Sequence, residues 1–184
     1  MIESKAIKAA SYFAAKKDIR VYLRGVWIES RDGIKAHVLA TDGNRMFAQA
    51  VPMVVARPFS VRMSGSTLSS VIDAGLFELG SDLKTVVLHN GAVLPLDLEP
   101  GTYPDWRRVV PLQPTGEPMP LPLGQVVDIE KAFKALKVKP ERYRITYNGP
   151  SAAVITHQDV PELLILQTPF KAMKEAPNDY RSIL

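Results

Sequence analysis

The chain has 184 residues, 46% of them hydrophobic and 23% charged, with a formal net charge of +4 and a pI near 9.3. This length and apolar content can bury one good core and part of a second, and the positive charge favours anionic partners without identifying them. The lack of cysteine excludes disulfides and cysteine-based metal sites, and no apolar run approaches the ~20 residues of a membrane span. Because the N-terminus is charged where a signal peptide would be apolar, we expect a cytoplasmic protein.

The first predicted element is a helix over residues 1–18, in which Ile7, Ala10 and Phe13 recur at helical spacing while the lysines stand mostly on other faces. No strand is predicted before it. Strand-like stretches separated by Asp-Gly turn signals come next. We expect these strands at residues 20–23, 26–28, 34–39 and 46–51.

A second cycle begins with a predicted strand at residues 59–63 and a helix that Ser64 or Ser66 can cap and that ends near Gly75. Asn90-Gly91 is a strong hairpin signal between the strands that follow. Those strands are expected at residues 85–88 and 92–98. This cycle therefore looks one strand short.

A third cycle follows residues 111–124, which contain five prolines and two glycines and form the one clear linker. Asp128 can cap a helix that carries Ile129 and Phe133, and Asn148-Gly149 predicts a turn after the first strand. The strands are expected at residues 143–147, 152–156 and 163–166. Helix followed by strands, three times over, favours an α+β fold in layers over a wound βαβ sheet.

Two short strings carry the most specific information. Residues 40–47 read Ala-Thr-Asp-Gly-Asn-Arg-Met-Phe, and residues 102–111 read Thr-Tyr-Pro-Asp-Trp-Arg-Arg-Val-Val-Pro. Each puts a tight turn beside arginines and apolar side chains, which is not the make-up of a catalytic centre. In this order and at this spacing, the strings resemble the paired signatures of the bacterial sliding clamp family, the β subunit of DNA polymerase III.

The resemblance implies the DNA-clamp fold, which repeats half-domain units of a helix and antiparallel strands, with about three such units in this chain. It implies a complete domain at residues 1–111, a linker at 112–122, half a domain at 123–170 and a tail at 171–184. The family's ring would take about twelve such units, so we expect a homo-oligomer, with a tetramer favoured.

In that family three chain segments meet in a pocket that grips partner peptides. The resemblance places in this pocket Thr41, Gly43, Asn44, Arg45, Met46, Pro104, Arg108, Val109, Pro169 and Phe170. An apolar slot of this kind accepts leucine or aromatic anchors, while arginines and turn amides fix the peptide backbone. Asn44 stands where the family commonly has histidine, and residues 168–170 replace its Met-Pro-Met, which changes the peptide that fits. For Asp42, Asp105 and Trp106 we favour plain structural roles.

The helices that would line the ring carry most of the cations expected to face DNA. These are Lys5, Lys8, Lys16, Lys17, Arg20, Lys131, Lys134, Lys137 and Lys139. Such a surface can surround a duplex through its phosphates without reading bases. The middle helix has no lysine or arginine between residues 64 and 80 and contributes little positive charge.

We expect no enzymatic activity and no cofactor. His37, His89 and His157 lack metal-ligand spacing, and no phosphate-binding glycine loop or nucleophile elbow occurs. The favoured hypothesis is a processivity factor that closes into a ring around duplex DNA and tethers polymerase or repair proteins, with a clamp loader as a possible further partner. Two alternatives stay open: a clamp-fold adaptor that binds clamp-interacting proteins without encircling DNA, and general DNA binding through the basic helices.

Overall fold

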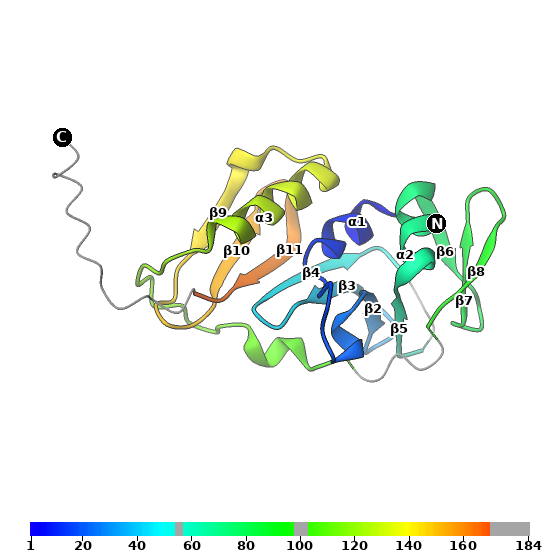
Figure 1. The fold of residues 1–184 in the computed structure, drawn as a ribbon, viewed down its shortest axis with the longest axis horizontal. Helices are drawn as coiled ribbons and strands as arrows, with labels where there is room; N and C mark the ends of the chain where they lie inside the picture. The colour runs from blue at the N-terminus through cyan, green and yellow to red at the C-terminus, as the bar shows by residue number, and fades with distance from the viewer. Residues whose placement is uncertain (54–56, 98–102, 170–184) are drawn as a thin grey trace.

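The computed structural model describes residues 1–53, 57–97 and 103–169, which form three α-helices and two antiparallel sheets (Figure 1). The helices are α1 (Lys5–Ser11), α2 (Gly65–Ala74) and α3 (Leu123–Leu136). One sheet has the order β5 (Phe59–Met63), β2 (Val26–Ser30), β3 (Ala36–Thr41), β4 (Arg45–Val51), β11 (Val160–Gln167), β10 (Ala153–His157) and β9 (Tyr143–Thr146). The other has the order β1 (Ile2–Glu3), β6 (Leu76–Leu79), β7 (Thr85–Leu88) and β8 (Val93–Pro95). Short 3-10 turns are η1 (Val21–Leu23), η2 (Trp106–Val109) and η3 (Pro140–Arg142).

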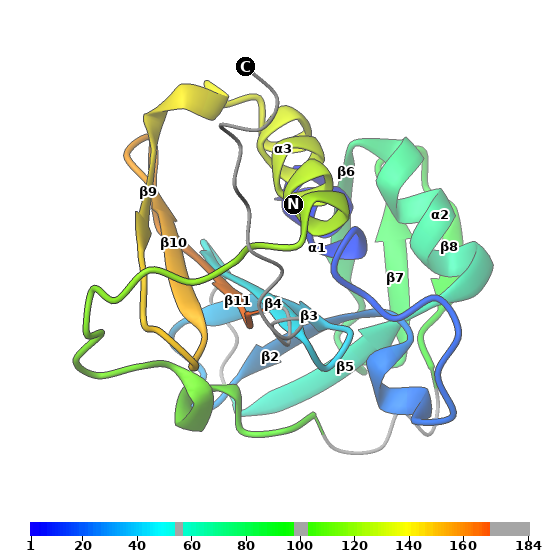
Figure 2. The same ribbon diagram turned by 60° about the vertical axis from the view of Figure 1, so that its left-hand side comes forward.

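All three helices lie on the same side of the sheets, with α1 between α2 and α3 (Figure 2). The main core fills the space between them, where Phe13, Phe47, Phe77 and Phe133 are almost completely buried. A second, smaller apolar cluster lies on the opposite, outer face of the large sheet around Trp27. The α+β fold expected from the sequence is confirmed. Within the described residues, no helix has the length and apolar character needed to cross a membrane.

The first cycle departs from its prediction at both ends of the predicted helix. The helix covers only residues 5–11, because Ile2 and Glu3 form strand β1 and pair with Phe77 and Leu76. The expected absence of a first strand was therefore wrong, since two residues are too short to show a pattern. Residues 21–23 form η1 and not a strand, after a tight turn in which the Asp18 carboxylate accepts the backbone N–H of Arg20 at 2.8 Å.

The second cycle has the strand that the sequence pattern missed. Gly75, with φ of 79°, ends α2, and β6 starts at the very next residue, so helix and strand run together in the sequence. Ser64 occupies the N-cap position of α2, but its hydroxyl bonds to Asp97 and caps no helix amide. The hairpin at Asn90-Gly91 is confirmed by the pairing of β7 with β8.

The third cycle joins the first one directly, because residues 163–167 of β11 pair with residues 45–49 of β4. The turn at Asn148-Gly149 is confirmed, with Ser151 donating its N–H to the Asn148 carbonyl at 3.0 Å. The predicted cap at Asp128 was wrong. Helix α3 begins at Leu123 after Pro122, and Asp128 lies inside the helix, where its carboxylate bonds to other side chains.

Candidate functional site: a pocket on the outer face

A pocket of about 240 Å³ opens on the outer face of the large sheet, where four segments far apart in the sequence meet. These segments are η1, the turn between β3 and β4, the string that contains η2, and the end of β11. Its lining residues are Arg20, Tyr22, Leu23, Thr41, Gly43, Asn44, Arg45, Met46, Tyr103, Pro104, Asp105, Trp106, Val109, Ala152, Leu166 and Thr168.

Most of the predicted pocket residues meet here. Thr41, Gly43, Asn44, Arg45, Met46, Pro104 and Val109 all line the pocket. Arg108 is exposed and does not line it, and Pro169 lies one residue beyond the lining residue Thr168. Phe170 lies outside the described residues.

The turn between β3 and β4 is held by its own side chains. The Thr41 hydroxyl donates to the Arg45 carbonyl at 2.7 Å and accepts the N–H of Gly43 at 3.0 Å. The Asp42 carboxylate accepts the N–H of Asn44 at 2.9 Å. Gly43 has φ of 92°, a conformation that favours glycine, and its Cα lies close to the exposed guanidinium of Arg20. Asp42 thus has the structural role we favoured.

The end of β11 is fastened to the same turn. The Asn44 carbonyl accepts two hydrogen bonds from Thr168, from its N–H at 3.0 Å and from its hydroxyl at 2.6 Å. This contact joins residues 124 positions apart, next to the pairing of Leu166 on β11 with Met46 on β4. The third wall of the pocket therefore depends on the pairing of β11 with β4.

Arg45 supports the pocket from behind. Its side chain is only 9% exposed and its guanidinium donates to the carboxylates of Asp42 and Asp128, both at 2.9 Å, and to the Tyr12 carbonyl at 2.9 Å. It also lies over the ring of Phe13, 5.2 Å from the centroid. Since these partners occupy most of its donors, Arg45 joins β4 to α1 and α3 and is not a free cation for a ligand.

Asp128 supplies one half of this ion pair. Burial alone would raise the pKa of its carboxyl group, but hydrogen bonds from Lys131 and Arg45 outweigh burial and hold the pKa below its ordinary value. A pKa that is lower in the folded chain than in the unfolded chain gives stability above the unfolded pKa, and this stability is lost as the pH falls through the folded pKa.

Asp128→Asn is therefore expected to lower the free energy of unfolding at neutral pH by about 1–3 kcal/mol. The difference from the unmodified chain should shrink below the ordinary carboxyl pKa of 3.8. Urea denaturation at a neutral and an acidic pH measures both values. Glu130→Gln, which changes an exposed carboxylate on the same helix, serves as the control. An equal difference at both pH values would show that the ionised carboxylate is not what stabilises the fold.

The string at residues 103–109 is fixed to the outer face of the sheet through Glu29 on β2. Its buried carboxylate accepts the indole N–H of Trp106 at 3.1 Å and the guanidinium N–H of Arg107 at 2.9 Å. Tyr103 packs on Trp27, with ring centroids 5.4 Å apart. Asp105 accepts a hydrogen bond from the Arg31 guanidinium at 2.7 Å, so Trp106 and Asp105 both fix the string, the structural role we favoured, and both also line the pocket.

Several pocket residues carry no signal in the sequence. Tyr22 and Leu23 come from η1, and Ala152 comes from the loop before β10. Arg20, predicted to face DNA, lies instead at the pocket, beside Gly43 and bonded to Asp18. Only the folded chain brings these residues together, because no local pattern links them to the two strings.

The eight predicted DNA-facing lysines are all exposed. Three of them form ion pairs with nearby carboxylates: Lys5 with Glu3, Lys131 with Asp128 and Lys134 with Glu130. The other five, which make no ion pair within the described part of the chain, are Lys8, Lys16, Lys17, Lys137 and Lys139. These five cations are therefore the ones available for phosphate contacts.

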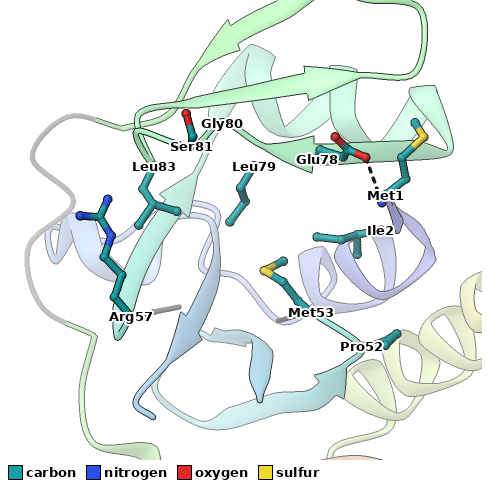
Figure 3. A pocket seen from close by; sticks show the side chains of 10 residues that line it. All are labelled: Met1, Ile2, Pro52, Met53, Arg57, Glu78, Leu79, Gly80, Ser81 and Leu83. Atoms are coloured by element: carbon teal, nitrogen blue, oxygen red, sulfur yellow. Dashed lines mark ion pairs between the residues drawn. The ribbon is translucent and has the colours of Figure 1, made fainter. Parts of the chain in front are cut away.

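A second hollow, of about 590 Å³, lies beside β1 and β6 (Figure 3). Ile2, Met53 and Leu79 lie around it, and the N-terminal ammonium group forms an ion pair with Glu78 at 3.1 Å. It contains no residue of the two signature strings. Within residues 1–53, 57–97 and 103–169, no group of three or more potential metal ligands occurs.

No protein-family model matches the chain. In a 119-residue alignment that covers 60% of the chain, it is 29% identical to the "Beta sliding clamp" of Salmonella typhimurium and 30% identical to that of Escherichia coli K12. The matched part is 32% of each of those proteins, so the alignment spans about a third of their length.

Solved structures match more of the chain. The DNA polymerase III β subunit of Thermotoga maritima gives a TM-score of 0.72 at 14% identity, over 92% of this chain and 63% of that one. The Pseudomonas aeruginosa sliding clamp bound to griselimycin gives a TM-score of 0.71 at 14% identity, over 91% of this chain and 63% of that one.

Proposed function

The chain belongs to the β sliding clamp family, and from that premise we propose that it is a processivity factor, an oligomeric ring around duplex DNA that tethers polymerase or repair proteins. The observation that carries the proposal is the pocket, in which both signature strings and the end of β11 meet. Tethering raises the effective concentration of a bound enzyme at its template without any catalysis by the clamp.

The pocket suits a short peptide with apolar anchors. Met46, Leu166 and Val109 supply apolar walls, and the exposed turn residues Gly43 and Asn44 border them. A leucine or aromatic side chain gains most of its binding energy by leaving water in such a slot. Arg20, exposed and paired with Asp18, is the cation at the rim of this slot, whereas the guanidinium of Arg45 is buried inside the protein.

The helices supply the surface for DNA. Since α1 and α3 lie on the side of the sheets away from the pocket, DNA and a partner peptide would bind opposite faces (Figure 2). Contacts from exposed lysines to phosphates are sequence-independent and weaken as salt rises, which permits sliding.

We expect the chain to stay on nicked circular plasmid through gel filtration and to be released when the plasmid is linearised. Lys8→Glu, Lys16→Glu and Lys137→Glu together should abolish retention, because three exposed cations that form no ion pair with any described residue become anions next to the duplex. Arg108→Glu, a single charge reversal at η2 on the outer face, should leave retention unchanged.

Two outcomes would favour the alternatives. Equal binding to linear and circular DNA would indicate general DNA binding. Peptide binding by a chain that stays monomeric and is never retained would indicate an adaptor.

A further inference from the structure

The free edge of the large sheet at β9 distinguishes the third cycle from the first two. The comparison is between β2, β6 and β9, each of which is the first strand after the α-helix of its cycle. Strand β2 lies between β3 and β5, and β6 lies between β7 and β1. Strand β9, the first strand after α3, pairs within the described residues only with β10. It is the one member of the three with an open side in the part of the chain that the structure describes.

The two closing strands come from a reciprocal exchange. Strand β5 ends one residue before α2 and closes the sheet of the first cycle, while β1 ends one residue before α1 and closes the sheet of the second. In each of these two cycles, the strand that precedes the helix therefore pairs with the first strand after the helix of the other cycle. The exchange is fixed where Ser4 donates its N–H to the Gly75 carbonyl at 2.8 Å.

The segment that precedes α3 has the chemistry of such a closing strand. Residues 118–122 read Pro-Met-Pro-Leu-Pro, so only Met119 and Leu121 keep a backbone N–H. In an extended strand, alternate residues direct their N–H and C=O groups to the same side. Both donors therefore face one neighbour, and the prolines block the other side, as suits the edge of a sheet.

These two donors are unused in the described structure. The segment starts at the turn between β9 and β10, where Gly116 donates to the Tyr147 carbonyl at 2.9 Å and Gly149 donates to the Glu117 carbonyl at 2.8 Å. From there it runs to the start of α3 and does not join the sheet (Figure 2). Neither the N–H of Met119 nor that of Leu121 bonds to any described group. One chain therefore carries both an open acceptor edge and an unpaired donor segment.

Exposed apolar side chains occur on both α3 and β9. Leu123 and Val127 on α3 are 83% and 47% exposed, and Tyr143 on β9 is 48% exposed. In the first two cycles the corresponding helices, α1 and α2, contact each other, as the hydrogen bond from the Ser4 hydroxyl to the Ile72 carbonyl shows. Helix α3 contacts α1 on one side, and no further helix of the described residues covers its other side.

We propose that residues 118–122 of a second copy of this chain close the free edge of β9, and that the exchange is reciprocal about a two-fold axis. The same strand exchange that joins the first two cycles within one chain then joins the third cycles of two chains, and each donor segment finds the acceptor edge of its partner. This deepens the proposed ring, on which it rests, by naming one of its contacts.

Cross-linking tests the contact directly, because the chain has no cysteine of its own. Copies carrying Leu121→Cys are mixed with copies carrying Arg144→Cys, which lies on β9, and treated with a short bismaleimide. We expect cross-linked dimers in the mixture. Leu112→Cys, which changes an almost fully exposed residue of the same linker, replaces Leu121→Cys in the control mixture and should give few dimers. Equal yields in the two mixtures would overturn the proposal.

Native mass spectrometry gives an independent readout. Leu121→Pro removes one of the two donors and should weaken dimerisation about tenfold or more. Pro120→Ala, which adds a donor on the side that faces away from β9, should leave dimerisation unchanged. Circular dichroism checks that both variants fold. An unmodified chain that stays monomeric at micromolar concentration, or a mass distribution that Leu121→Pro does not change, would refute the exchange. Dimers that form as described but are not retained on circular DNA would refute the proposed clamp function and leave the exchange standing.

Discussion

Val109→Asp is expected to weaken the binding of a peptide with leucine and phenylalanine anchors at least about tenfold, which is ~1.4 kcal/mol. Val109 lines the pocket but is 60% exposed, so the substitution places a carboxylate beside the anchor without disturbing the core. An apolar anchor then has to leave water beside a charge, which opposes binding. Fluorescence anisotropy of the labelled peptide measures the change.

Arg108→Ala is the matched control for this variant. Arg108 is the preceding residue and is also exposed, but it does not line the pocket, so its loss should change peptide affinity by less than about twofold. The family resemblance places both Arg108 and Val109 in the pocket, whereas the structure places only Val109 there. Comparing the two variants therefore tests which assignment is correct. An equal loss of peptide affinity in both variants would show that Arg108 also contributes to the peptide site. An unchanged affinity for Val109→Asp would count against this pocket as the peptide site.

Phe47→Ala is expected to lower the free energy of unfolding by about 3–5 kcal/mol, a large part of the 5–15 kcal/mol that holds a typical domain together. Phe47 is fully buried, its ring lies 5.6 Å from that of Phe13 on the α1 side, and it pairs with Ala40 on β3 and Ile165 on β11. Removing the ring leaves a cavity at the point where the first and third cycles are joined.

Val93→Ala is the control for this experiment, because Val93 is 59% exposed on β8 and its loss should change stability by less than about 0.5 kcal/mol. Urea denaturation of both variants at one fixed protein concentration keeps any contribution from oligomer formation equal. Similar midpoints for the two variants would mean that the joint between β4 and β11 is not tightly packed.

The same joint links stability to the proposed function. Met46, the residue before Phe47, faces the outer side of the sheet and lines the pocket, because side chains alternate along a strand. The pocket and the main core are therefore two faces of one strand. Peptide binding by Phe47→Ala should be measured under conditions in which the variant is still folded.

The sequence by itself determined those features that neighbouring residues create. The turns at Asn90-Gly91 and Asn148-Gly149 form where the pattern predicts them, and so does the β3–β4 turn, because hydrogen bonds within a few residues hold them. The three cycles of helix and strands also follow from local periodicity. The two strings pointed to the clamp family and to most of the pocket residues.

Only the tertiary structure decided what depends on partners distant in the chain. Strand β1 exists because its two residues pair with β6 more than seventy positions away, and no two-residue pattern can predict that. Arg45 was expected to be a cation of the pocket, but its guanidinium is engaged inside the protein, because Asp128, 83 positions later, lies on the helix packed behind it. Arg20 moved from the expected DNA face to the pocket because η1 turns the chain there. Local hydrogen bonds are encoded by adjacent residues, whereas these contacts form only once separate elements pack together.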